Sequence, residues 1–500
     1  MQMALPAGGG ISLRQLLPDA RFVGAEDIRV TSCAADSRAC QRGDLFAALP
    51  GSECDGIDFV HHALARGAKG LLVDQPVDDV PLPQCLVSDV REAFGNICQA
   101  LAGNPSQQLR VIGITGTNGK TTTSYLVAGV LEAAGLHAGV AGTLGIYDGA
   151  ELRPSRLTTP GAAELAHSLA TMYANGCSHA VLEVSSHALA QRRVAGIEFD
   201  VAAFTNVRHD HLDYHKSPEE YLAAKSRLLE LVRPEGLAVF NTDDAQCGEL
   251  AADFYGPALT VGMEHPAEIT ATPAERFISE QTFLLSTGDT CVPVRTPLVG
   301  QHNVSNCLIA AAVGLAYQLD LATIVRGLES VASIPGRLER IECGQGFGVF
   351  VDYAHTADAL AQVLDSLRPL TRGRLICVFG AGGDRDRFKR PHMGRAVQER
   401  ADVAVVTSDN PRYESPRKIA NEILAGMRHR SQVRVELDRG TAICWALREA
   451  RPGDCVLIAG KGHEECQIVE EERYYFDDRE IARQWLYDHE PLSPAARRAA

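Results

Sequence analysis

Long apolar runs are missing from this sequence of 500 residues. No run is long enough to cross a lipid bilayer, which excludes a protein built on transmembrane helices. The first ten residues, MQMALPAGGG, also lack the basic segment followed by a long apolar stretch that marks a secretory signal. We therefore expect a cytoplasmic protein with no membrane insertion.

Cysteines at metal-binding or redox spacing are missing as well. The fourteen cysteines are scattered along the chain, and no Cys-x-x-Cys pair occurs. In a chain of this length, such cysteines are expected to be reduced and often buried. A disulfide framework and a zinc site of the Cys-x-x-Cys kind are therefore not expected.

Basic residues are fewer than acidic residues in this chain. The 48 lysines and arginines against 63 aspartates and glutamates give a net charge of −15. So acidic a chain is a poor nonspecific binder of nucleic acid, and we expect no nucleic-acid partner. The guanine-reading motif Asn-Lys-x-Asp is also absent. Any recognition of phosphate should therefore occur at a local site.

A glycine-rich stretch at residues 109–123, L-R-V-I-G-I-T-G-T-N-G-K-T-T-T, is the most informative feature that is present. Its β-branched start predicts a buried strand, and the Ala/Leu/Val-rich segment behind it predicts a helix. Backbone N–H groups of such a loop bind phosphate, while Lys120 reaches the β- and γ-phosphates and Thr121 binds Mg²⁺. The strict pattern has glycine where this chain has Ile114, so a glycine turn beside a surface lysine is the alternative.

Length and pattern predict an α/β protein of three domains. Residues 1–108 are predicted to form a small α/β domain, and residues 109–335 a parallel-sheet domain that begins with the phosphate loop. In residues 336–488, strands alternate with helical stretches, which predicts a βαβ sheet covered on both faces. Residues 489–500 are predicted to form a flexible tail. The strands of the last domain are expected at 348–354, 374–380, 401–408 and 454–460.

Polar side chains follow the predicted strands of the central segment. Glu183 lies in the predicted strand 180–187, and His211 follows the predicted strand 201–207. Because the carboxyl ends of parallel strands gather at one edge of a sheet, these residues and Thr121 are candidate Mg²⁺ ligands. Imidazole is an uncommon ligand for so hard a cation. The alternative is that Glu183 and His211 are ordinary hydrogen-bonded residues.

Two further residues are ambiguous on their own. Lys225, in Y-L-A-A-K-S-R, is typical of a solvated helix lysine. Asn303, in G-Q-H-N-V-S-N before an Ala-rich helix, fits either a helix cap or a contact with a nucleotide base. In the last segment, polar clusters follow all four predicted strands and together indicate one binding face: 352–355, 383–386, 409–412 and 461–464.

These motifs, in this order, resemble those of the Mur ligase family, the ATP-dependent amide-forming enzymes of peptidoglycan precursor synthesis. The resemblance covers nearly the whole chain. It rests on T-G-T-N-G-K-T (115–121), L-E-V-S-S-H (182–187), Asn206 with D-H-L-D-Y-H (210–215), H-N-x-x-N (302–306), G-R (336–337), D-Y-A-H (352–355) and G-K-G-H-E (460–464).

The resemblance implies one domain for a UDP-linked substrate, one for ATP, and a Rossmann-like domain for the incoming amino acid. It implies ATP and Mg²⁺ and an acyl phosphate formed on the substrate. We expect a monomer. D-N-P-R at 409–412 resembles the motif of members that add meso-2,6-diaminopimelate to the D-Glu γ-carboxylate of UDP-N-acetylmuramoyl-L-alanyl-D-glutamate. Members that add L-lysine differ at this motif.

For nucleotide and metal, the resemblance implies a set of residues around the phosphate loop. Lys225 resembles the lysine that this family carbamylates, which would turn a cation into an anionic oxygen ligand. The implied ATP-binding residues are Gly116, Thr117, Asn118, Gly119, Lys120, Thr121, Thr122, Asn303, Arg337 and Asp352. The implied metal ligands are Thr121, Glu183, His211 and carbamylated Lys225, and the implied catalytic residues are Lys120, Glu183, His211 and Lys225.

The resemblance also implies two substrate pockets. Some members have asparagine where this chain has Leu157, so one contact of the sugar or phosphate differs here. The UDP-muramyl-dipeptide would be bound by Ser37, Thr158, Thr159, Ser185, Gln191 and Arg193. Diaminopimelate would be bound by Arg385, Asp409, Asn410, Pro411, Arg412, Gly460 and Glu464.

The residue types in the second pocket suit that substrate. The planar fork of Arg412 can bind the distal carboxylate in a bidentate manner, and Glu464 can pair with an ammonium. A lysine substrate would leave the arginine without its anion, at the cost of an unpaired charge.

Alternatives remain open at this stage. Within the superfamily they are an L-lysine-adding ligase and a folylpolyglutamate synthase-like ligase. Outside it they are a phosphate-loop switch or motor, which the missing guanine motif and the acidic charge disfavour, and a nonenzymatic nucleotide-binding module. The last would leave Glu183, His211 and Lys225 unexplained.

Overall fold

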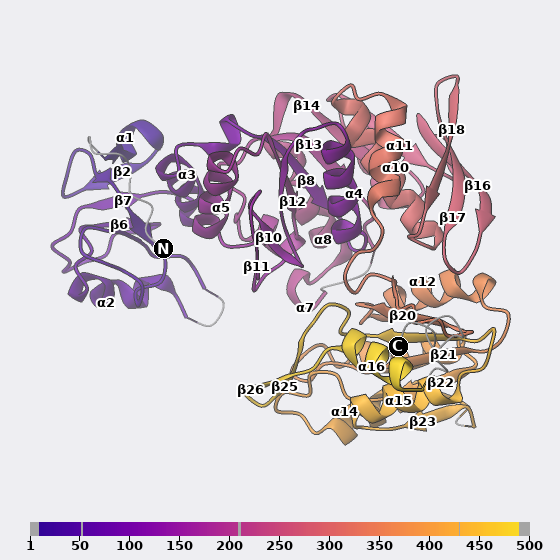
Figure 1. Cartoon of the computed structure of the whole chain (residues 1–500). Helices are drawn as coiled ribbons and strands as arrows, with labels where there is room; N and C mark the ends of the chain where they lie inside the picture. Colours follow the sequence, from indigo (N-terminus) through magenta and orange to yellow (C-terminus); the bar gives the residue numbers. More distant parts are fainter. Residues whose placement is uncertain (1–9, 52–53, 209–211, 430, 490–500) are drawn as a thin grey trace, which may run out of the picture. The chain divides into compact units, whose positions relative to one another are not determined.

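A computed structural model describes residues 10–51, 54–208, 212–429 and 431–489. The chain divides into two compact units. The first runs as far as Val261 and includes Ile309–Ile324, and the second comprises Gly262–Leu308 and continues from Val325. Figure 1 shows both, coloured along the sequence from indigo to yellow.

The N-terminal part of the first unit contains a small sheet with strand order β2-β7-β6-β5-β4. Its central strand β6 is apolar and fully buried, and it runs parallel to both neighbours. The strands here are β1 (Ile11–Ser12), β2 (Arg21–Val23), β3 (Arg29–Val30), β4 (Cys33–Ala34), β5 (Leu45–Ala47), β6 (Gly70–Val73) and β7 (Gln84–Leu86); the helices are α1 (Leu13–Leu16), α2 (Val60–Ala65) and α3 (Val90–Leu101).

The rest of the first unit is built on a larger sheet whose strands follow the order β11-β10-β9-β12-β8-β13-β14-β15. β8 runs parallel to β12 on one side and β13 on the other. The strands are β8 (Arg110–Thr115), β9 (Ala138–Gly142), β10 (Gly145–Tyr147), β11 (Leu152–Arg153), β12 (His179–Glu183), β13 (Phe199–Phe204), β14 (Val232–Asn241) and β15 (Ala258–Gly262). The helices are α4 (Lys120–Ala133), α5 (Ala162–Ala174), α6 (Ser186–Ala190), α7 (Leu212–His215), α8 (Pro218–Ser226) and α9 (Ala245–Asp253).

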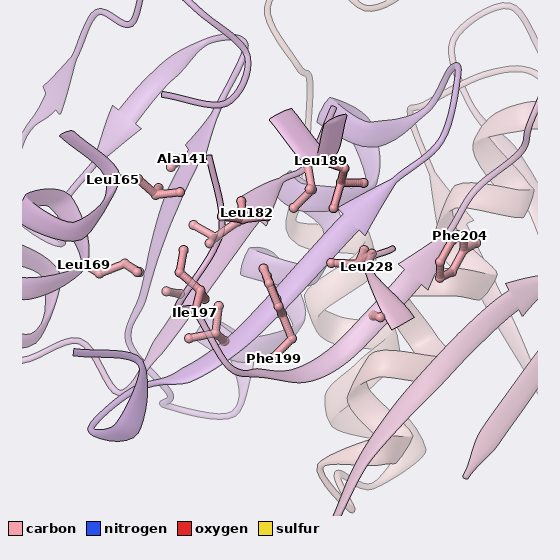
Figure 2. Close-up of a cluster of buried hydrophobic side chains, with 14 of the residues drawn as sticks. Ala141, Leu165, Leu169, Leu182, Leu189, Ile197, Phe199, Phe204 and Leu228 are labelled. Carbon is pink, nitrogen blue, oxygen red and sulfur yellow. The ribbon is translucent and has the colours of Figure 1, made fainter. Parts of the chain in front are cut away.

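One core cluster packs against this sheet. Figure 2 shows Leu165 and Leu169 of α5 pointing toward the strand that carries Leu182, and all three belong to one buried cluster. Gly113 of β8 leaves room for the ring of Phe199, because a Cβ there would lie 2.7 Å from that ring. Packing of this density fixes the strands that carry the loops described below.

The second unit contains three antiparallel strands and, apart from them, a sheet that is mostly parallel. The antiparallel strands pair in the order β16-β17-β18: β16 (Ile269–Arg276), β17 (Gln281–Thr287) and β18 (Thr290–Thr296). The mostly parallel sheet has the order β19-β20-β24-β21-β22-β23, and from β20 to β23 its neighbours are parallel. A separate hairpin joins β25 (Cys466–Val469) to β26 (Glu472–Tyr475).

The strands predicted for the last domain are confirmed, each within its predicted range. They are β20 (Gly348–Asp352), β21 (Leu375–Phe379), β22 (Val403–Val406) and β24 (Cys455–Ala459), with β19 (Glu339–Arg340) and β23 (Val433–Val435) at the edges. The helices are α12 (Ala357–Leu367), α13 (Lys389–Gln398), α14 (Pro416–Ala425), α15 (Arg439–Glu449) and α16 (Asp478–His489). α10 (Gln301–Ala316) and α11 (Leu321–Ser330) contribute residues to both units. The predicted α/β class is confirmed.

Two predicted strands of the central segment were too long at their ends. Residues 201–207 were predicted as a strand, but β13 ends at Phe204. Residues 180–187 were predicted as a strand, but β12 ends at Glu183 and α6 begins at Ser186. The hydroxyl of Ser185 accepts a hydrogen bond from the backbone N–H of Ala188 and caps this helix.

The state of the cysteines and the absence of long apolar helices were both expected from composition. No disulfide joins any of the fourteen cysteines, all of which lie in the described ranges, and eight of them are buried. Within the described ranges, no helix has the length and apolar character that a membrane crossing needs.

Candidate functional site

The loop after β8 is held in one shape by the end of β13. Gly116 has a φ of +151°, and a Cβ there would lie 1.8 Å from the hydroxyl of Thr205. The backbone N–H of Thr117 donates to the carbonyl of Asn206 at 2.8 Å, and that of Asn118 donates to its side-chain oxygen at 2.9 Å. The loop therefore needs glycine at this point and is braced before any ligand binds.

The helix behind the loop starts as the phosphate-loop pattern predicts. Gly119 adopts a left-handed φ of +86° and precedes Lys120, the first residue of α4. The Lys120 ammonium donates to the carbonyls of Gly116 at 2.7 Å and Thr117 at 2.9 Å, so it lies over the loop itself. Thr122 is buried in the first helical turn.

Glu183, the last residue of β12, joins two threonines at the same edge of the sheet. Its Oε2 accepts hydrogen bonds from the hydroxyls of Thr121 and Thr143, both at 2.9 Å. Its Oε1 accepts from the backbone N–H of Thr143, also at 2.9 Å. The predicted meeting of Thr121 and Glu183 is thus present in the geometry. Thr143 was missed, although it follows β9 as Glu183 ends β12, and the same rule of polar residues at strand ends could have found it.

These oxygens suit a hard cation. Hydroxyl and carboxylate oxygens are the ligands that Mg²⁺ takes, and it usually keeps several waters and substrate phosphate oxygens besides. Among the residues the structure describes, no group of three or more His, Cys, Asp or Glu side chains could hold a metal alone. Thr121 and Glu183 therefore fit an ion that phosphate helps to bind. The predicted ligand His211 lies outside the described residues.

Lys225 is not a solvated helix lysine. Its side chain on α8 is 1% exposed. The Nζ atom donates to the carbonyl of Gly116 at 2.9 Å and lies 4.6 Å from the centre of the Tyr221 ring. The residue therefore reaches the phosphate loop from a distant helix. In the amine form it is a donor and offers no ligand oxygen.

A chain of hydrogen bonds links Glu183 to the residues predicted for the muramyl-dipeptide. The Thr159 hydroxyl donates to the Glu183 carbonyl at 2.8 Å and accepts from the backbone N–H of Ser185 at 3.0 Å. Arg193 donates to the Thr159 carbonyl at 2.9 Å and donates two further hydrogen bonds to the side-chain oxygen of Gln191. Thr158 lies at 3.2 Å from the Thr143 hydroxyl.

A cavity of about 850 Å³ lies in the first unit beside this chain of hydrogen bonds. Gln191 and Arg193 line it, as does Asp36 next to the predicted Ser37. The Ser37 hydroxyl itself is buried and contacts His62 Nδ1 at 2.9 Å. Sequence reasoning missed three more arginines that line the cavity, since no motif marks them: Arg91, Arg153 and Arg192.

Three residues predicted to contact ATP belong to the second unit. Asn303, on the first turn of α10, donates to the carbonyl of Val299 at 2.8 Å and is buried. Asp352, at the end of β20, accepts backbone hydrogen bonds from Leu338 and Ala354, both at 2.7 Å. Burial raises the pKa of Asp352, which Arg337 and these donors partly oppose. The Arg337 guanidinium stacks over the ring of Tyr353 at 4.6 Å.

The predicted amino-acid pocket gathers at the carboxyl ends of β21, β22 and β24. The guanidinium of Arg412 donates to the carbonyl of Gly383 at 2.8 Å. No carboxylate among the described residues forms an ion pair with Arg412. Burial lowers its pKa, and the neighbouring Arg385 lowers it further. Two guanidinium groups that lie close together and lack an anion form a site for a carboxylate.

Acidic and amide groups lie in the same pocket. Asn410 donates from its side chain to Glu464 Oε2 at 2.9 Å. Burial and the nearby Asp409 raise the pKa of Glu464. Burial alone would also raise the pKa of Asp409, but Lys461 and Arg439 lower it below its usual value. Gly460 allows this packing, because a Cβ there would lie 2.6 Å from Asp409 Oδ2.

A set of hydrogen bonds, here called the arginine bracket, joins loop 382–386 to loop 409–414. Arg390, fully buried, binds both oxygens of Glu414 at 2.9 and 2.7 Å and the carbonyl of Gly382 at 2.9 Å. Glu414 also accepts from the backbone N–H of Asp384 at 2.7 Å. The bracket therefore fixes the loops that carry Arg385 and Arg412. Its members were not predicted.

Family models match the chain in three places. A model described as "Mur ligase family, catalytic domain" matches residues 29–100, one described as "Mur ligase middle domain" matches 114–314, and one described as "Mur ligase, glutamate ligase domain" matches 336–462.

Curated relatives and solved structures match over most of their length. A UDP-N-acetylmuramoyl-L-alanyl-D-glutamate–2,6-diaminopimelate ligase of Gloeobacter violaceus is 44% identical over 92% of this chain and 94% of its own. A solved structure of an enzyme with the same name is 31% identical, with a TM-score of 0.69 over 96% of this chain and 100% of its own. The MurF ligase of Thermotoga maritima, solved in complex with ADP, is 18% identical with a TM-score of 0.62 over 91% of this chain and 96% of its own, which shows a shared fold.

Proposed function

The chain belongs to the Mur ligase family, and from this premise we propose that it is an ATP-dependent ligase that adds meso-2,6-diaminopimelate to UDP-N-acetylmuramoyl-L-alanyl-D-glutamate. The observation that carries the choice of amino acid is the pocket in the second unit, where Arg412 and Arg385 lie close to Asn410 and Glu464. Relatives at 44% identity bear this substrate pair in their names.

Each predicted domain has a proposed role. Residues 1–108 would bind the UDP moiety, residues 109–335 would bind ATP, and residues 336–488 would bind diaminopimelate. The cavity that Asp36 and Arg91 of residues 1–108 line together with Arg193 supports the first role, because its arginines suit an anionic, nucleotide-linked substrate. UDP-linked substrate and ATP are cytoplasmic metabolites, which is consistent with a cytoplasmic monomer that needs no nucleic-acid partner.

The phosphate loop supports the use of ATP. Backbone N–H groups of the loop that Asn206 does not already hold, together with those at the start of α4, would bind the phosphates. Lys120 would turn from the loop carbonyls to the transferred group. Thr121 and Glu183 would hold Mg²⁺, which neutralises charge on the phosphates when it is bound. Asn303, Arg337 and Asp352 are proposed to contact adenine, phosphate and ribose.

Lys225 is proposed to act as a carbamate. Its neutral amine would add to CO₂ and release one proton, leaving a carboxylate on the side chain. That carboxylate would serve a second Mg²⁺ together with His211. The burial of Lys225 and its contact with the Gly116 carbonyl support this role, because they direct its Nζ toward the phosphate loop.

The proposed chemistry has two steps. A γ-carboxylate oxygen of D-Glu attacks the γ-phosphorus of ATP, the bond to the β-phosphate oxygen breaks, and ADP leaves. The neutral amine of diaminopimelate then attacks the acyl carbon, the bond to phosphate breaks, and inorganic phosphate and one proton leave. The protein's task in the first step is positioning and charge neutralisation. In the second step it must keep water from the acyl phosphate.

An omission assay tests the proposal. ADP release should require both the UDP-linked dipeptide and diaminopimelate, and L-lysine should replace diaminopimelate poorly. Lys120→Ala, which removes the charge facing the transferred phosphoryl group, should abolish turnover in a folded protein. A preference for L-lysine, or turnover with folate and glutamate, would replace this proposal with one of the alternative ligases.

A further inference from the structure

Lys461 has an unusual place in the amino-acid pocket. Its side chain is fully buried, and the backbone carbonyl of Cys466 accepts one hydrogen bond from Nζ at 2.6 Å. Asn410 Oδ1 lies 2.8 Å from the same Nζ, and Glu464 Oε2 lies 3.7 Å away. Burial of an ammonium costs free energy unless the group is paired and hydrogen-bonded. The contacts with Cys466, Asn410 and Glu464 offset that cost here.

The contacts of Lys461 decide which way the Asn410 amide points. A lysine ammonium has three donors and no acceptor, so the amide atom next to it must be oxygen. The backbone N–H of Ile468 donates to that same atom at 3.0 Å, which requires oxygen independently. The amide nitrogen must then face Glu464, where it donates to Oε2 at 2.9 Å.

This orientation leaves one oxygen of the Glu464 carboxylate, Oε1, able to accept a hydrogen bond from a ligand. Both contacts of Glu464 with Asn410 and Lys461 fall on Oε2. In the described part of the chain, Oε1 has no hydrogen-bond partner, and the side chain is 31% exposed. A carboxylate oxygen of a partly exposed side chain that still lacks a donor suits an ammonium group.

We propose that Lys461 is a positioning residue for the incoming amino acid. By fixing the Asn410 amide with its nitrogen toward Glu464, it presents the second oxygen of that carboxylate to an ammonium of the substrate. The inference rests on the proposed function, which places an amino acid with an ammonium and a carboxylate at each end in this pocket. Arg412 and Arg385 then bind the carboxylate of the end whose ammonium Glu464 binds.

Lys461 also acts on the ionisation of Glu464. Burial and the nearby Asp409 raise the pKa of this carboxyl, whereas Lys461, the hydrogen bond from Asn410 and Arg412 lower it. The charge of Arg439 and the hydroxyl of Tyr353 act on the same group. Because an ammonium pairs only with the ionised form, the acid side of kcat/KM for diaminopimelate reports this ionisation.

The experiment compares the wild-type enzyme with Lys461→Met, which keeps the length of the apolar stem and removes the charge. We expect KM for diaminopimelate to rise at least about tenfold, with kcat and KM for ATP within about twofold. The acid limb of kcat/KM should move to higher pH, since the pKa of Glu464 rises further without Lys461. Lys418→Met, on the exposed surface of α14, is the matched control and should change nothing.

Asn410→Asp tests the same idea if Lys461→Met does not fold. It places an oxygen where the amide nitrogen faces Glu464, and the acid limb should again move to higher pH because two carboxylates then face each other. An unmoved acid limb in a folded variant of either kind would overturn the role of Lys461. A wild-type enzyme that needs no diaminopimelate for turnover would instead overturn the proposed function, and this inference with it.

Discussion

Lys225 and Lys461 are both buried, and their surroundings differ in kind. Lys225 faces a backbone carbonyl of the phosphate loop and the ring of Tyr221. Lys461 faces an amide oxygen and lies close to the carboxylate of Glu464. The first lies against the phosphate loop, where a chemical change at its nitrogen is proposed, whereas the second is held by the groups that it is proposed to orient.

Lys225→Ala should reduce turnover by at least about two orders of magnitude, because it removes the proposed anionic ligand beside the transferred phosphate. A short carboxylic acid added to the assay should restore part of the activity by replacing the carbamate oxygens. Steady-state rates with and without the acid are the measurement. Lys69→Ala, an exposed lysine of the same unit, should behave as wild type. A fully active Lys225→Ala enzyme would contradict the carbamate.

Arg412 combines its charge with a special backbone. Its φ is +49°, in the left-handed region that costs a residue other than glycine of order 1–3 kcal/mol. Its N–H donates to Ile468 at 3.1 Å, and its carbonyl accepts from Glu470 at 2.9 Å, so the hairpin of β25 and β26 holds it there. A strained residue held by its neighbours points to a functional position.

Arg412→Ala should lower kcat/KM for diaminopimelate by about two or more orders of magnitude, since each ~1.4 kcal/mol of lost binding is tenfold. Arg412→Lys should recover only part of this, because a point charge cannot reproduce the bidentate fork. KM for ATP and for the UDP-linked substrate should change little. Steady-state kinetics of both variants with diaminopimelate and L-lysine make the test, and Arg417→Ala on exposed α14 is the control. Unchanged use of diaminopimelate by Arg412→Ala would contradict the assignment.

At the scale of elements, the arginine bracket explains how two loops that each present an arginine to the same pocket stay together. Arg385 and Arg412 repel each other, yet the backbone N–H of Gly383 donates to the carbonyl of Asn410 at 2.9 Å and the N–H of Tyr413 donates to Asp384 at 3.1 Å. The ion pair of Arg390 on α13 with Glu414 of the second loop adds the charged part of the bracket. The pocket is therefore braced before substrate arrives, which lowers the cost of ordering it on binding.

Glu414→Gln should reduce the free energy of unfolding at pH 7. The hydrogen bonds from Arg390 lower the pKa of Glu414 from 4.5 to about 2. A carboxylate with a depressed pKa stabilises the fold above its unfolded value, and this contribution is lost as the pH falls from 4.5 toward about 2. The difference between wild type and Glu414→Gln in urea unfolding should therefore shrink below pH 4.5.

Glu399→Gln is the control for that measurement. Glu399 pairs with Arg395 in an exposed i,i+4 arrangement on α13, and such pairs contribute little to stability. Its effect at pH 7 should be much smaller than that of Glu414→Gln. Equal effects of the two substitutions would show that the bracket does not depend on the charge of Glu414.

Elements with a strong local pattern could be predicted from the sequence, and contacts between distant segments could not. Thr121 and Glu183 were predicted to meet because both were placed toward the carboxyl ends of buried parallel strands, and their side-chain oxygens lie 2.9 Å apart. The contact of Lys225 with Gly116 joins residues 109 positions apart, and the pattern around the lysine is that of an exposed helix. The burial of Arg390 could not be predicted for the same reason. The residue lies in a segment rich in basic residues, and its burial depends on Glu414 and Glu422, which are distant in sequence.

At the scale of the whole molecule, the first unit carries the phosphate loop and the large cavity, and the second carries the pocket of Arg412 and Glu464. Along the sequence, the phosphate-loop motif likewise comes before the motifs of the amino-acid pocket. The phosphate loop and the residues proposed to select the amino acid therefore lie in separate sheets, and substitutions in one should leave the other folded.

The fourteen free cysteines allow a test of the whole fold at once. Eight are buried, and burial raises the pKa of Cys85 to about 11 and those of Cys307 and Cys455 to about 12, which leaves almost no reactive thiolate at neutral pH. A thiol reagent should therefore modify the exposed Cys54 and Cys291 first, and the buried thiols only as fast as the protein opens. All fourteen should react in denaturant without reductant. Ligands of both units should slow the buried class and leave the exposed class unchanged, because they stabilise the folded state alone. Fewer than fourteen reactive thiols in denaturant would mean that the chain holds a disulfide which its sequence and fold both argue against.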